Sequence, residues 1–138
     1  MRLSLRLLTL SAVLFLPGVS IAGERFDGRW LTTLTCEPLQ DALGFSWNFV
    51  SEVKDGHLLG IYGTEGQPAS IRIDGHIAED GSATLHAAGK TGYKQYVPGQ
   101  QMARGTDFGY DISAQFHDRD GKGTRLEGRP CSYTFKRQ

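Results

Sequence analysis

The chain has 138 residues, of which 39% are hydrophobic, and it carries 15 basic and 15 acidic residues. This length allows one domain at most, and the zero net charge excludes a protein that binds nucleic acid through a basic surface. The sequence has no heptad repeat, low-complexity tract or run of like charges, which argues against a coiled coil and against disorder.

The first 22 residues have the pattern of a secretory signal peptide. Arg2 and Arg6 form a charged start, the segment 7–16 is almost entirely apolar, and Ser20-Ile21-Ala22 places small residues at the −3 and −1 positions of a cleavage site. The apolar segment is shorter than the roughly 20 residues that cross a bilayer. We therefore expect cleavage, which leaves residues 23–138 as one soluble domain in the periplasm or outside the cell.

The two cysteines gain meaning from this expected export. In an oxidising compartment, Cys36 and Cys131 are expected to form one disulfide rather than to remain free thiols. They lie 95 residues apart, and they lack the C-x-x-C spacing or nearby histidine that a redox or metal site would need. Closing a loop of this length contributes on the order of 4–5 kcal/mol of stability in the chain-entropy account.

Apolar and polar residues alternate along most of the mature chain, which is the pattern of strands with one buried face. Eight such runs can be identified, clear at 45–53, 70–77, 108–116 and 131–135 and weaker at 29–36, 57–63, 83–90 and 123–129. Asp-Gly pairs at 55–56, 80–81 and 120–121 are typical of hairpin turns. The pattern favours a small antiparallel eight-stranded up-and-down β-barrel over a two-sheet sandwich, because closure would bring the two cysteines onto neighbouring strands.

The side chains expected to point into the barrel are unevenly distributed. Aromatic residues gather on the first, second, sixth and eighth strands: Trp30, Phe45, Trp47, Phe49, Tyr110, Phe116, Tyr133 and Phe135. Small residues gather on the fourth to seventh strands. The large side chains either fill the space left by the small ones, which we favour for a barrel of this size, or leave room for one small hydrophobic ligand. In the second case, Trp47, Phe49 and Tyr110 are the expected ligand-binding residues.

One connection is longer than the others. Residues 91–107 join the fifth and sixth expected strands, and loops of this length in compact domains are usually functional or disordered. The segment combines aromatic and basic side chains, so it is either a contact surface for a partner, with Tyr93, Tyr96 and Arg104 as the partner-binding residues, or a passive flap over the barrel end.

Gly28-Arg29-Trp30, at the start of the first expected strand, resembles the G-x-W motif of the lipocalins and the wider calycin group. The resemblance implies that Trp30 closes one barrel end and stacks against a late arginine, with Arg137 as the first candidate and Arg129 as the second. The mature chain is shorter than a typical lipocalin, and the long first loop of that family has no counterpart here.

A broader likeness covers most of the mature chain. The pattern Phe26-Asp27-Gly28-x-Trp30…Cys36, followed by Gly128-Arg129-Pro130-Cys131, is similar to that of small exported bacterial proteins without assigned function. This likeness implies location and fold only.

The sequence offers few groups for chemistry. His76 and His86 would face each other if the fourth and fifth strands were joined by residues 80–82, but zinc usually takes at least three protein ligands. A nucleophile elbow, a phosphate loop and an H-E-x-x-H motif are all missing from the sequence. We therefore expect no catalytic residues, no metal and no cofactor.

These observations together predict an exported, monomeric, non-enzymatic binding module. One hypothesis is a carrier or sensor of a small hydrophobic ligand that binds inside the barrel. The other is a protein-binding module, such as an inhibitor of a secreted hydrolase, that acts through the 91–107 loop.

Overall fold

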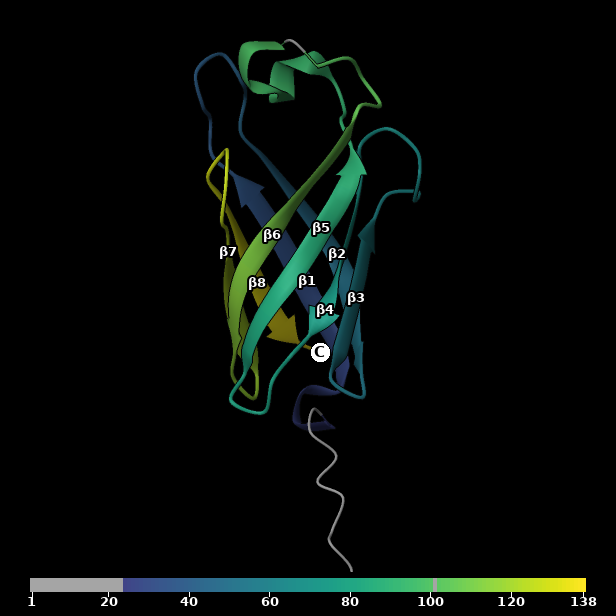
Figure 1. Ribbon diagram of the computed structural model, residues 1–138, viewed down its shortest axis with the longest axis vertical. Coiled ribbons are helices and arrows are strands. Elements are labelled where there is room, and N and C mark those ends of the chain that lie inside the picture. Colours follow the sequence, from purple (N-terminus) through teal and green to yellow (C-terminus); the bar gives the residue numbers. More distant parts are fainter. Residues whose placement is uncertain (1–23, 101) are drawn as a thin grey trace, which may run out of the picture.

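The computed structural model describes residues 24–100 and 102–138, shown as a coloured ribbon in Figure 1. The expected signal peptide, residues 1–22, lies outside the described residues. No helix in the described part of the chain is long and apolar enough to cross a membrane.

The predicted fold is confirmed: eight antiparallel strands form a closed up-and-down barrel in which each strand pairs with the next and the last pairs with the first. The strands are β1 (Gly28–Cys36), β2 (Phe45–Lys54), β3 (His57–Tyr62), β4 (Ser70–His76), β5 (Ser82–Lys90), β6 (Asp107–Phe116), β7 (Asp120–Arg125) and β8 (Cys131–Arg137). Short 3-10 turns are present at η1 (Glu24–Phe26), η2 (Lys94–Tyr96) and η3 (Pro98–Gln100).

The predicted disulfide is also confirmed. Cys36 and Cys131 lie opposite each other in the β1–β8 pairing, and their sulfur atoms are bonded. Both side chains point into the barrel, because Cys36 shares its buried parity with Leu34 and Cys131 shares its parity with Tyr133. The disulfide therefore joins the two strands that close the cylinder, as expected from the alternation pattern.

The seventh strand lies earlier in the chain than expected. Asp120-Gly121, predicted as a turn, instead begins β7, and the turn is formed by 117–119 with the amide of His117 donating to the carbonyl of Asp120. Gly121 lies opposite Phe116, and a Cβ at this position would be 3.0 Å from the Phe116 ring. The glycine thus makes room for an aromatic ring, a role that its Asp-Gly context does not reveal.

The expected pairing of His76 with His86 is wrong. The connection between β4 and β5 turns one residue earlier than predicted, so Ile77 lies opposite Ala83 and every cross-strand partner moves by two residues. His86 therefore lies opposite Asp74, and its imidazole contacts the carboxylate of Asp111 at 3.0 Å. His76 lies opposite His57 in the separate β3–β4 pairing.

The barrel end at the start of β1, called the closed end below, is filled by aromatic side chains. Trp30, Phe116 and Phe135 are almost completely buried. The Trp30 and Phe116 rings meet edge to face, with centroids 5.4 Å apart. The indole Nε1 of Trp30 donates to the carbonyl of Phe26, which satisfies the polar atom of this buried side chain.

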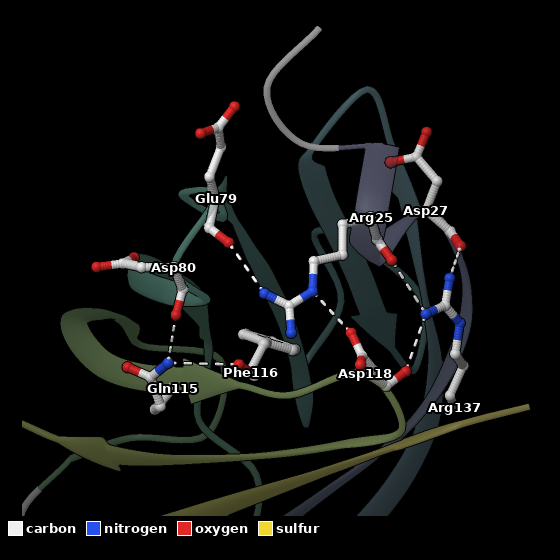
Figure 2. A network of polar contacts seen from close by, with 8 residues as sticks. All are labelled: Arg25, Asp27, Glu79, Asp80, Gln115, Phe116, Asp118 and Arg137. Atoms are coloured by element: carbon white, nitrogen blue, oxygen red, sulfur yellow. Dashed lines mark hydrogen bonds and ion pairs between the residues drawn. The ribbon is translucent and has the colours of Figure 1, made fainter. Parts of the chain in front are cut away.

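A network of arginine contacts covers the closed end (Figure 2). Arg137 donates to the backbone carbonyls of Arg25, Asp27 and Asp118, and its guanidinium lies 5.4 Å from the centre of the Trp30 ring. Arg25 in turn donates to the carboxylate of Asp118 at 2.7 Å and to the carbonyl of Glu79. These bonds connect η1, the β4–β5 connection and the β6–β7 turn.

Candidate functional site

The opposite end of the barrel, called the mouth below, contains a cavity of about 730 Å³. Side chains from β1, β2, β3, β4, β6 and β7 line it, and residues 91–100 and 102–106 lie over it, visible as the green turns above the strands in Figure 1. The expectation of a filled core is therefore correct for the closed end and wrong for the mouth. A cavity of this size is in the range that holds small organic ligands.

Stacked aromatic rings form one wall of the cavity. The rings of Trp47 and Tyr62 are nearly parallel with centroids 4.4 Å apart, and the ring of Phe45 lies 4.9 Å from that of Trp47. These rings stack on one another along β2 and β3, so they lie along the wall of the cavity. This arrangement explains why large residues on the inward parity leave the mouth hollow.

The three expected ligand-binding residues do not all face the cavity. Trp47 and Tyr110 line it, but Phe49 is buried one step deeper, where its ring lies 6.2 Å from that of Tyr62. Phe49 thus supports an aromatic ring of the wall instead of forming the wall itself.

The three expected partner-binding residues lie on the segment over the mouth. Tyr93 and Tyr96 line the cavity from above, and the guanidinium of Arg104 lies 5.0 Å from the centre of the Tyr93 ring. Two residues of each expected set, Trp47 and Tyr110 from the first and Tyr93 and Tyr96 from the second, therefore line the same cavity.

Hydrogen bonds to backbone and side-chain atoms hold this segment of residues 91–100 and 102–106, called the lid below, in place over the mouth. Thr91 ties the two ends of the segment together. Its hydroxyl donates to the carbonyl of Ala103 and accepts from the amide of Thr106. Contacts with the β1–β2 loop fasten the far side, because the amide of Leu43 donates to the carbonyl of Gln95 and the amide of Gly99 donates to the carboxylate of Asp41.

Arg129 joins the loops that surround the mouth. Its buried guanidinium donates to the carbonyls of Glu37, Leu43 and Tyr96 at 2.6 to 3.1 Å and lies over the ring of Phe45. Burial, and then the nearby charge of Arg125, lower the pKa of this guanidinium from its usual value. Sequence reasoning considered Arg129 only as a second partner for Trp30, although its inward parity next to Cys131 places it at the mouth.

Arg125 and Tyr110 form the floor of the cavity, and the buried Tyr133 lies next to Tyr110. The guanidinium of Arg125 lies 4.0 Å from the centre of the Tyr110 ring, and the Tyr110 hydroxyl is hydrogen-bonded to the Tyr133 hydroxyl at 2.6 Å. Burial raises the pKa of both phenols, so both carry their protons at neutral pH and offer no general base. Arg125 was missed, because the expected seventh strand ran past it without a clear alternation.

The described residues contain no group of three or more His, Cys, Asp or Glu side chains arranged to hold a metal ion. The His57–His76 pair, with ring centroids 4.8 Å apart, lies at the closed end and belongs to no such group. The mouth itself combines an apolar surface with arginine side chains and tyrosine hydroxyls.

No protein-family model, curated protein or solved structure matches this chain. The geometry of the mouth is therefore the basis for a functional assignment.

Proposed function

We propose that the protein is a non-enzymatic carrier or sensor that binds one small hydrophobic ligand in the mouth of the barrel. The observation that carries this proposal is the cavity of about 730 Å³ lined by the aromatic rings of Phe45, Trp47, Tyr62 and Phe108. A pocket lined mainly by apolar and aromatic side chains, with a few polar groups, is the usual form of a small-molecule site.

Two further features support a site built for a ligand. The lid is fastened by hydrogen bonds at both of its sides, so its position over the aromatic surface is set by the fold itself. The disulfide is typical of an oxidising compartment, which agrees with a role in the bacterial envelope or outside the cell.

The test is a titration of the exported protein with N-phenyl-1-naphthylamine, a neutral dye whose emission rises in apolar surroundings. We expect saturable binding at one site, together with quenching of Trp47 emission by the dye. Replacing the stacked indole in Trp47→Leu should weaken binding about tenfold or more, because a stacking surface worth roughly 1.5 kcal/mol is lost.

Val50→Ser is the matched control, because Val50 lies on the outer face of the same strand and is exposed. It should leave dye binding unchanged. Absence of saturable binding, or equal affinity in Trp47→Leu and the parent protein, would contradict the proposal. Native mass spectrometry of the protein taken from the periplasm would then identify the ligand class from any bound mass.

A protein-binding role is the second candidate, favoured by the exposed apolar side chains around the mouth. Tyr93, Leu126, Leu43 and Met102 are between 44% and 60% exposed. A partner that docks there would be lost from a Tyr93→Ser/Met102→Ser variant, whereas dye binding deeper in the cavity would persist. Loss of the partner with retention of the dye would support this role, and retention of the partner in this variant would contradict it.

A further inference from the structure

The charged side chains that line the cavity indicate which chemical class of ligand it would bind. Among the described residues that line the cavity, the charged ones are Arg125 and Arg129, and no carboxylate is part of the lining. The acidic residues of the surrounding loops, Glu37, Asp41 and Glu127, are exposed to solvent. The hydrophobic surface is therefore combined with positive charge that has no negative counterpart within the cavity.

Neither arginine forms an ion pair with a carboxylate of the described residues. The ion pairs formed among the described residues involve Arg25, Arg72, His86 and Lys90, and neither Arg125 nor Arg129 takes part in them. A buried or half-buried guanidinium without a carboxylate is unfavourable unless other groups compensate its charge. Backbone carbonyls do so for Arg129, as described above.

Arg125 is different, because its outer nitrogens are not used by the fold. Its Nε donates to the carbonyl of Glu127, whereas Nη1 and Nη2 have no hydrogen-bond partner within the described part of the chain. The guanidinium carbon lies 4.0 Å from the centre of the Tyr110 ring, so the ring packs against this side chain. A guanidinium can offer two parallel N–H groups to the two oxygens of a carboxylate or sulfonate.

We propose that the ligand is an anion, a hydrophobic or aromatic molecule with one carboxylate or similar oxyanion that pairs with Arg125 while its apolar part lies against Trp47 and Tyr62. This inference rests on the proposed function and adds the chemical class of the ligand. The neighbouring charge of Arg129 adds to the positive potential at this point and has a structural role of its own.

The test compares two dyes that share an anilinonaphthalene skeleton. N-phenyl-1-naphthylamine is neutral, and 8-anilino-1-naphthalenesulfonate carries one sulfonate. We expect the sulfonate to bind at least about tenfold more tightly, which corresponds to one hydrogen-bonded charge pair in a partly buried site. Its affinity should fall as sodium chloride is raised from 20 to 500 mM, whereas that of the neutral dye should not.

Arg125→Gln is the decisive variant. It should bring the ratio of the two affinities, sulfonate over neutral dye, down to about one, and this ratio within one variant corrects for any change in the cavity that affects both dyes. Lys122→Gln is the matched control, since it removes the same charge from the same strand, but Lys122 is exposed on the outer face. This variant should keep the preference, and circular dichroism should show that both variants are folded.

The outcomes separate the inference from the proposed function. If neither dye binds saturably, the carrier function fails. If both dyes bind with equal affinity, or if Arg125→Gln keeps the preference for the sulfonate, the cavity is a ligand site but the anion inference is wrong.

Discussion

Two buried hydroxyls, those of Tyr110 and Tyr133, lie where the filled and hollow halves of the barrel meet. Each hydroxyl is the hydrogen-bond partner of the other, so neither remains unsatisfied in the core. This pair makes the floor of the cavity polar at one point, next to Arg125. At the scale of single residues, the pair couples the stability of the fold to the protonation of its phenols.

This coupling predicts a loss of stability in alkaline solution. Burial raises the pKa of both phenols above the ordinary value of 10.0. Below that pH, both tyrosines are protonated in the folded and the unfolded state and contribute no pH dependence. Above it, the unfolded chain loses these protons first, so the free energy of unfolding falls as the pH rises.

The measurement is urea unfolding at pH 9 and at pH 11, for the parent protein and for Tyr110→Phe/Tyr133→Phe. The parent should lose about 1 kcal/mol or more beyond the loss seen in the double variant over this interval. The double variant carries the same remaining titratable groups, so it serves as the reference. An equal loss in both proteins would show that the phenols ionise freely in the folded state.

Sequence reasoning at this scale found the aromatic residues and missed the arginines. Trp47 and Tyr110 were predicted at the site because aromatic residues on the inward parity stand out in an alternating pattern. Arg125 and Arg129 are also inward, but a charged residue near a strand end is normally solvated. Only the tertiary structure shows that backbone carbonyls accept hydrogen bonds from Arg129 and that the Tyr110 ring packs against Arg125.

At the scale of elements, the lid depends on a side chain that does not belong to it. Arg129, in the loop before β8, donates to one carbonyl of the lid and to two carbonyls of the β1–β2 loop. The lid is thus held by two loops that are far from it in the sequence, the β1–β2 loop and the β7–β8 loop that contains Arg129.

Arg129→Met should therefore loosen the lid while the strands remain paired. We expect amide hydrogen exchange in residues 37–44 and 91–100 to become about tenfold faster or more, because a charge-assisted hydrogen bond contributes roughly 1.5–3 kcal/mol. Hydrogen-exchange mass spectrometry measures this directly. Arg119→Met, an exposed arginine in the turn at the closed end, should leave exchange in both segments unchanged; equal protection in Arg129→Met would mean that the lid is held by its other bonds.

The elements that were misplaced are those whose local signals are ambiguous. An Asp-Gly pair predicts a turn, but Gly121 is inside β7 because Phe116 needs the space beside it. The β4–β5 register depends on where the turn is centred, and a turn one residue earlier places His86 opposite Asp74 instead of His76. In both places, contacts between residues of two different strands determine where the turn forms. The sequence of a single strand does not reveal such contacts.

At the scale of the whole molecule, the fold and its covalent closure could be predicted, whereas the cavity could not. Alternation over eight runs fixes which face of each strand is buried, and the cysteines at opposite ends of the mature chain identify the strands that must meet. Whether inward side chains fill a barrel depends on how rings stack along its wall. The Trp47–Tyr62 stack is such a feature, and alternation does not encode it.

The disulfide should stabilise the protein mainly through the unfolded chain. It closes a loop of 95 residues between β1 and β8, and constraining such a loop contributes on the order of 4–5 kcal/mol in the chain-entropy account. We expect Cys36→Ala/Cys131→Ala to lower the free energy of unfolding by about 3–4 kcal/mol in urea. Reduction of the parent protein should produce a similar decrease.

The same double-alanine variant tests whether the disulfide stabilises the protein through the unfolded chain or through packing in the folded barrel. Trp30 lies at the closed end, whereas the disulfide is at the mouth, so the buried indole should keep its emission spectrum in the folded variant. Placing Trp47→Phe in both proteins leaves Trp30 as the single tryptophan, which can be excited selectively over the tyrosines. A red-shifted Trp30 spectrum before the unfolding transition would show that the disulfide also maintains native packing along the whole barrel. A decrease in stability below about 1 kcal/mol would instead show that the eight-stranded closure constrains the chain ends without it.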